Sequence, residues 1–159
     1  MKTKLLSIST LLMWASLTAC TGQQAAASTE LPKQTQASST EAQPQPVTEM
    51  TSLVDAFRAA GATVDPDQPV EQPFFSVKGE ILKINGADNQ VFEYSTAEEM
   101  EADAAKVAPD GGSIGTSMVS WIEPPHFYKA GRIIVLYVGQ DQAILDLLKS
   151  ILGPQFAGR

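Results

Sequence analysis

Residues 133–139, with the sequence IIVLYVG, form an unbroken apolar run that constrains the fold more than any other stretch. A strand with one face in water alternates apolar and polar side chains, and this run does not alternate. The run therefore predicts a central strand of a sheet, apolar on both faces. The chain of 159 residues is long enough for one ordinary domain around such a strand.

A second strand signal lies in residues 79–94. Leu82 and Ile84 share one face of a strand, Asn85-Gly86 is a typical hairpin turn, and residues 90–94 (QVFEY) return. We therefore expect a β-hairpin here. Residues 62–65 (ATVD) and 117–122 (SMVSWI) are expected to add two shorter strands.

Three helices are expected from capping residues followed by apolar residues at helical spacing. Ser52, Thr96 and Asp141 are the expected N-caps, and Gly61 and Gly153-Pro154 the expected stops of the first and third helices. In the second helix, residues 96–107, the apolar stripe is thin. Its acidic residues are expected to face water: Glu98, Glu99, Glu101 and Asp103.

The expected order of elements is therefore α-β-β-β-α-β-β-α. It predicts an α+β domain over residues 51–159, with a mostly antiparallel sheet of about four or five strands. The three helices are expected to pack mainly on one face. A crossover through the second helix could make one strand pair parallel.

The N-terminus is typical of a targeting segment. Lys2 and Lys4 precede an apolar stretch that ends near Ala19, too short for an ordinary membrane-spanning helix. We therefore expect residues 1–19 to be a signal peptide.

The segment ends in Leu17-Thr18-Ala19-Cys20, which resembles the lipobox of bacterial lipoproteins. The resemblance implies a diacylglyceryl group on Cys20, cleavage before that residue and attachment to a membrane through the lipid anchor. Thr21 stands where an Asp would favour inner-membrane retention, so the resemblance implies an outer membrane where there is one, and otherwise the cell membrane. The domain would then face the periplasm or the exterior. The alternative is a buried or reactive lone cysteine.

Residues 20–50 follow as a segment rich in Gln, Ser, Thr and Pro with few large apolar residues. Such a segment buries too little surface to offset its ordering entropy, so we expect a disordered tether. A Gln/Pro-rich ligand for the cell wall or a partner is the alternative. The net charge of −7 argues against a nucleic-acid partner, which would require a clustered basic surface.

Residues 123–132, EPPHFYKAGR, hold the single histidine of the chain. We interpret them as a strand-entry loop because they echo residues 71–80, EQPFFSVKGE, at a constant offset. The echo predicts that Phe75 and Phe127 occupy equivalent core positions. Pseudo-symmetry of residues 71–84 and 123–136 and chance similarity are both open.

The candidate ligand-binding residues are His126, Tyr128 and Trp121, in or near this stretch. No catalytic set is assigned, because no nucleophile-elbow pattern surrounds any serine. No metal site or cofactor is expected, since one histidine and one lipidated cysteine leave too few ligands for zinc.

The motifs around residues 79–86, 91–94 and 124–128 also resemble uncharacterised bacterial lipoproteins of similar length, a resemblance that implies no activity. We therefore expect a lipid-anchored, non-enzymatic binding or interaction module at the cell envelope, with an envelope protein or small ligand as partner. Two alternatives are open. One is a small hydrolase or transferase using His126 with Glu123, and the other is an inhibitor or regulator of a secreted enzyme.

The lipid anchor has a direct test. Replacing the thiol nucleophile in Cys20→Ala is expected to abolish incorporation of labelled palmitate and to leave the precursor uncleaved or the protein unanchored. Ser28→Ala, a substitution in the expected tether, is the matched control and should be processed normally. Normal processing with palmitate incorporation in Cys20→Ala would overturn the lipoprotein interpretation.

Overall fold

The computed structural model describes residues 45–159 of the chain. The expected signal peptide, the expected lipidation site Cys20 and the expected tether up to residue 44 lie outside the described residues. Within the described part, no helix is long and apolar enough to cross a membrane.

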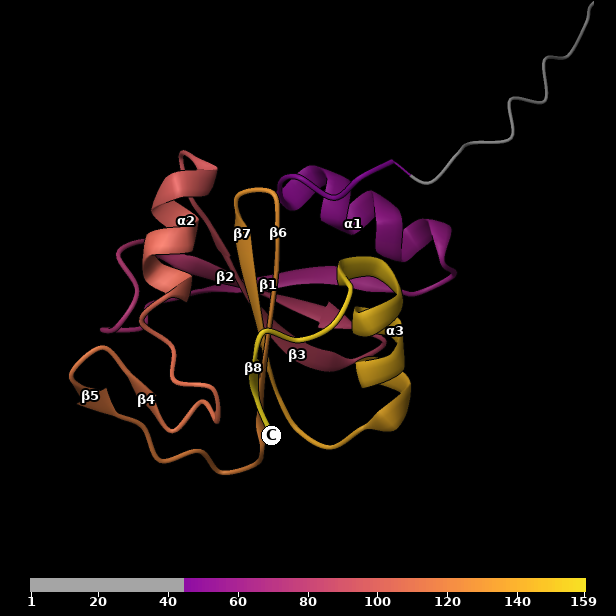
Figure 1. The fold of residues 1–159 in the computed structure, drawn as a ribbon. Helices are drawn as coiled ribbons and strands as arrows, with labels where there is room; N and C mark the ends of the chain where they lie inside the picture. The colour runs from indigo at the N-terminus through magenta and orange to yellow at the C-terminus, as the bar shows by residue number, and fades with distance from the viewer. Residues whose placement is uncertain (1–44) are drawn as a thin grey trace, which may run out of the picture. The chain divides into compact units, whose positions relative to one another are not determined.

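The described residues form three helices, a six-stranded antiparallel sheet and a small two-stranded sheet (Figure 1). The helices are α1 (Met50–Ala59), α2 (Ala97–Ala104) and α3 (Gln142–Leu152). The large sheet has the order β1-β2-β3-β7-β6-β8. Its strands are β1 (Val64–Val70), β2 (Gly79–Ile84), β3 (Ala87–Glu93), β6 (Pro125–Ala130), β7 (Ile133–Val138) and β8 (Ala157–Gly158). The small sheet pairs β4 (Ser113–Ile114) with β5 (Ser117–Met118).

The apolar run at residues 133–138 is a central strand, as predicted. β7 lies between β3 and β6 and pairs antiparallel with both. Its side chains alternate between two buried layers, because successive residues of a strand point to opposite faces. Ile133 and Val135 join one cluster, while Ile134 and Leu136 join the other.

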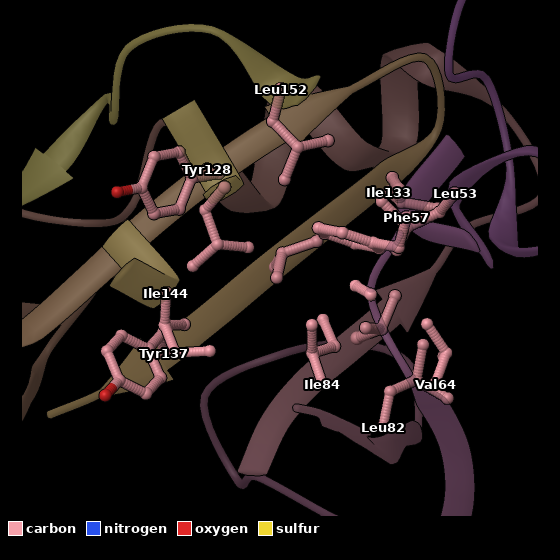
Figure 2. Close-up of a cluster of buried hydrophobic side chains, with 14 residues drawn as sticks. Leu53, Phe57, Val64, Leu82, Ile84, Tyr128, Ile133, Tyr137, Ile144 and Leu152 are labelled. Carbon is pink, nitrogen blue, oxygen red and sulfur yellow. The ribbon is translucent and has the colours of Figure 1, made fainter. Parts of the chain in front are cut away.

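Helices α1 and α3 cover the first face of the sheet. Leu53 and Phe57 of α1 and Ile144 and Leu148 of α3 pack there against apolar side chains of the strands. Figure 2 shows this cluster, and Figure 1 shows both helices on the same side of the sheet. The apolar side of α3 is thus buried against the sheet, as the helical spacing of its apolar residues predicts.

The second face is covered by α2 and by loops rich in aromatic residues. Met100 and Ala104 of α2 pack against Phe92 of β3 and Phe127 of β6 in one cluster. Two helices therefore share one face and α2 lies on the other. All strand pairs of the sheet are antiparallel, so the helical crossover from β3 to the later strands creates no parallel pair.

The predicted hairpin and two of the three predicted helix caps are confirmed. Asn85 and Gly86 connect β2 to β3 with φ angles of 50° and 84°, the left-handed conformation that this type of turn requires. Thr96 and Asp141 accept hydrogen bonds from the N–H groups of Glu99 and Ala143 and so cap α2 and α3.

Ser52 acts differently from the prediction. It is the third residue of α1, not its N-cap, because α1 begins at Met50. From there its hydroxyl oxygen accepts the N–H of Glu49, the N-cap residue, at 3.0 Å. This is the reverse half of a capping box, so the same side chain stabilises the helix start from inside the helix.

Two predictions for residues 117–132 are wrong. Residues 117–122 do not form a strand of the main sheet, since only Ser117–Met118 is a strand and it pairs with β4. Residues 123–132 are not an entry loop, because they contain β6 itself. Pro125 is the first residue of β6, a position where a strand tolerates a residue without an N–H.

The sequence echo has no counterpart in backbone structure. Phe75 and Phe127 are both buried in the second cluster, as the echo predicted. Phe75, however, lies in the loop between β1 and β2, whereas Phe127 lies within β6. Gly79 begins a strand, while Gly131 occupies a turn with a φ of 54°. The two segments therefore reach one core through different conformations.

The fold begins slightly before residue 51. The Arg132 N–H donates to the carbonyl oxygen of Thr48, and the Arg132 guanidinium pairs with Glu49 and Glu93 at 2.7 Å each. Gly131 lies so close to the Thr48 main chain that a Cβ atom would collide with it. The turn between β6 and β7 therefore holds the segment that leads into α1.

Asp103 was predicted to face water and is instead buried, with only 2% of its surface exposed. One carboxylate oxygen accepts hydrogen bonds from the N–H and hydroxyl of Ser76 and from the Tyr94 hydroxyl, and the other pairs with Lys106. Burial alone would raise the pKa of the Asp103 carboxyl, but the donated hydrogen bonds outweigh it and hold that pKa below its ordinary value. This network ties the loop between β1 and β2 to α2.

Asp103→Asn should lower the free energy of unfolding by about 3 kcal/mol, because one of the two acceptor oxygens becomes a donor in a buried site. Urea unfolding measures the loss. Asp55→Asn, on the exposed side of α1, is the matched control and should change stability by less than about 0.5 kcal/mol. A loss at Asp103 no larger than at Asp55 would show that the network contributes nothing.

The same variant has a predicted pH signature. The folded-state pKa of Asp103 is depressed, so its stabilisation is fully present above the unfolded value of about 4 and is lost as the pH falls through the folded value. The difference in stability between the parent and Asp103→Asn should therefore shrink in acid. A difference that is constant down to pH 2 would contradict this.

Candidate functional site

Two surface hollows border β6. The first, which we call the α3 groove, has a volume of about 260 Å³ and lies between β6, the polar side of α3 and the segment that follows α3. The second, the Trp121 hollow, has a volume of about 470 Å³ and is lined by residues 119–125 and Arg159.

The side chains that line the α3 groove come from β6 and α3, and the repeat of each element brings them to one side. His126 and Tyr128 are two residues apart in β6 and therefore lie on one face of the sheet, the face that α3 covers. Gln142, Asp146 and Lys149 recur at helical spacing along α3. Because the apolar side of α3 packs on the core, this polar stripe lies at the surface beside β6.

His126 is 6% exposed, and both of its ring nitrogens are engaged within the protein. Nε2 lies 3.1 Å from the carbonyl oxygen of Gly139 and donates to it, while Nδ1 lies 2.7 Å from Oε1 of Gln155. An imidazolium donates to both oxygens; a neutral imidazole serves both contacts once the Gln155 amide turns its NH₂ toward Nδ1. His126 therefore connects β6 to the end of β7 and to the segment after α3, and forms part of the groove wall.

Tyr128 combines a buried ring with a hydroxyl at the edge of the core. Its ring belongs to the first apolar cluster, and its hydroxyl points away from the rest of that cluster (Figure 2). Burial raises the pKa of Tyr128, and the negative charge of Asp146 raises it further. The hydroxyl therefore stays protonated at neutral pH and can donate a hydrogen bond into the groove.

The α3 groove carries one charge of each sign. Asp146 accepts a hydrogen bond from the Gln142 amide at 2.8 Å through Oδ1. Lys149, three residues further along α3, has no ion-pair partner within 4.0 Å among residues 45–159. A carboxylate and an ammonium thus border the same hollow without pairing with each other.

The Trp121 hollow is built around an anchored indole. The Trp121 Nε1–H donates to the carbonyl oxygen of Gly111 at 2.7 Å, and the ring meets Phe74 and Phe127 edge-on at centroid distances of 6.2 and 5.9 Å. Trp121 packs against the second apolar cluster, whereas Tyr128 belongs to the first. The three predicted ligand-binding residues therefore do not form one site. His126 and Tyr128 share the α3 groove, and Trp121 lines the other hollow.

Two large apolar side chains near the Trp121 hollow are almost fully exposed. Met118 is 91% and Ile122 is 94% exposed. Isolated apolar side chains of this kind are common on protein surfaces, so they define no binding surface by themselves.

The structure does not bring His126 and Glu123 together by a hydrogen bond. The Glu123 carboxylate accepts from the Gln140 amide, while the nitrogens of His126 contact Gly139 and Gln155. Among residues 45–159, no group of three or more His, Cys, Asp or Glu side chains is arranged to hold a metal ion.

Sequence reasoning missed the residues that give the α3 groove its charge. Asp146 and Lys149 stand out in the sequence as part of the polar side of an amphipathic helix, which is ordinarily a solvated face. Only the pairing of β6 with β7 and the packing of α3 show that this side borders His126 and Tyr128.

Comparison with family models, with curated proteins and with solved structures finds no match to this chain.

His126→Phe tests the structural role of the histidine, because it retains an aromatic ring beside Tyr137 and removes both hydrogen bonds. We expect the free energy of unfolding to fall by about 2 kcal/mol, measured by urea denaturation. Gln140→Ala removes a surface hydrogen bond nearby and should cost less than about 0.5 kcal/mol. Equal stability of His126→Phe and the parent would show that the two contacts are unimportant.

Proposed function

We propose that this chain is a lipid-anchored extracytoplasmic lipoprotein whose domain is a non-enzymatic binding module, with the α3 groove as its binding site. The lipobox-like segment ending at Cys20 supports the anchor, and the groove supports binding. Attachment to a membrane through the lipid anchor would present the domain to small molecules or partners at the envelope.

The observation that best supports binding is the set of chemical groups that line the α3 groove. It places a protonated phenol, a carboxylate and an ammonium around one hollow, with Leu145 contributing an apolar surface. A few convergent polar groups around an apolar floor are what small-molecule sites generally offer. At about 260 Å³ the groove is smaller than the usual range for drug-sized ligands, which favours a small ligand.

The geometry of His126 supports binding in preference to catalysis at this site. A histidine base must present a nitrogen to the reacting group, and both nitrogens of His126 serve contacts inside the protein. Its place in the wall of the groove instead suits a residue that holds β6 and the segment after α3 at a set distance.

The proposal is tested on residues 21–159, which contain the whole described domain. A panel of small amino acids, carboxylic acids, amines and polyols is added while amide spectra and the melting temperature are recorded. A ligand that binds only the folded state should raise the melting temperature and shift the amide signals of Tyr128, Asp146 and Lys149. If no panel member moves these signals, or if shifts appear only around Trp121, the α3 groove is not the binding site.

A further inference from the structure

We infer that the α3 groove binds a small zwitterion, a molecule that carries an ammonium and a carboxylate group a few atoms apart. This inference rests on the proposed function, since it names the ligand class of the same groove.

The first step concerns the two charges on α3. Residues three apart on a helix are neighbours, and an Asp and a Lys at this spacing commonly pair. Asp146 instead accepts a hydrogen bond from Gln142, and its Oδ2 atom has no hydrogen-bond partner among residues 45–159. Lys149 is likewise without an ion-pair partner in that part of the chain. Each charge is therefore available to a ligand.

The second step concerns spacing. Three residues of an α-helix span about 4.5 Å along its axis, so Asp146 and Lys149 present opposite charges at a short separation. A single small molecule can meet both, with its ammonium toward Asp146 and its carboxylate toward Lys149. A ligand with only one charge would satisfy one residue and leave the other next to a like charge or without a partner.

The third step concerns the rest of the lining. The Tyr128 hydroxyl stays protonated, because burial raises the pKa of Tyr128, and it can donate to a ligand carboxylate. Leu145 and Pro154 offer apolar contact for a short side chain. The net charge of −7 on the whole chain disfavours a ligand that is only anionic. These features together favour a molecule of the size and charge of a small amino acid or a dipeptide.

The probes are glycine, L-alanine, D-alanine and glycylglycine, matched against propionate, ethylamine and glycerol. Each is titrated into ¹⁵N-labelled residues 21–159 at constant ionic strength, and amide shifts are followed. We expect at least one zwitterion to bind more tightly than all three matched compounds and to shift the signals of Tyr128, Asp146 and Lys149.

Asp146→Asn and Lys149→Gln each remove one charge from an exposed position of α3 and are expected to retain the fold. Each should weaken zwitterion binding by about tenfold, since each removes one charge-assisted contact. Asp55→Asn, the same kind of change on α1, should leave the affinity unchanged. The melting temperature of each variant shows whether it is folded.

The outcomes separate the two proposals. Tighter binding of propionate, ethylamine or glycerol in the groove would overturn the zwitterion inference and leave the binding function standing. Zwitterion binding that is indifferent to both charge variants would also overturn the inference. Absence of groove shifts with every probe would overturn both proposals.

Discussion

The burial of β7 on both faces is the constraint on which the remaining structure depends. A strand whose side chains are apolar on both faces must be covered by two separate layers, and a full covering of one large aliphatic side chain contributes about 2 kcal/mol. α1 and α3 supply the first layer, and α2 with the aromatic loops supplies the second. The antiparallel neighbours β3 and β6 then complete the hydrogen bonds of β7 on either side.

The second layer is completed by polar groups as well as apolar ones. α2 is short, and the loop between β1 and β2 must lie against it to cover Phe92. The buried Asp103 carboxylate holds that loop by accepting hydrogen bonds from the N–H and hydroxyl of Ser76. A buried carboxylate is tolerated only when its oxygens receive hydrogen bonds, and here both do.

Much of the fold is predictable from the sequence because its signals are local. The hairpin at Asn85-Gly86 follows from a turn that few residue pairs can make, and Thr96 and Asp141 mark helix starts through short-range hydrogen bonds. β7 is predictable because an unbroken apolar run of this length is typical of a strand that is buried on both faces.

The parts that sequence reasoning missed depend on contacts between distant segments. Helical periodicity groups Asp103 with the solvated glutamates of α2. The periodicity carries no information about Ser76, a hydrogen-bond partner of Asp103 that lies 27 residues away in the sequence. The sequence predicts a loop where the structure has β6 for a related reason. Both faces of this strand are covered, so His126 and Phe127 do not show the alternation of a half-exposed strand, and the two prolines before them suggest a turn.

The α3 groove lies where the segment after α3 returns to β6. β8 has two residues and runs antiparallel to β6, with Ala157 opposite Phe127 and Gly158 opposite His126, so it begins past the position of Tyr128. The segment between α3 and β8 begins at Gly153, whose φ of 83° follows the end of the helix. It leads toward β6, where the Phe156 N–H donates to the carbonyl oxygen of Phe127. Tyr128 and the polar side of α3 border the hollow beside this segment, which contributes Pro154 and Gln155 to its lining. The segment that brings the chain back to complete the sheet thus also forms one wall of the groove.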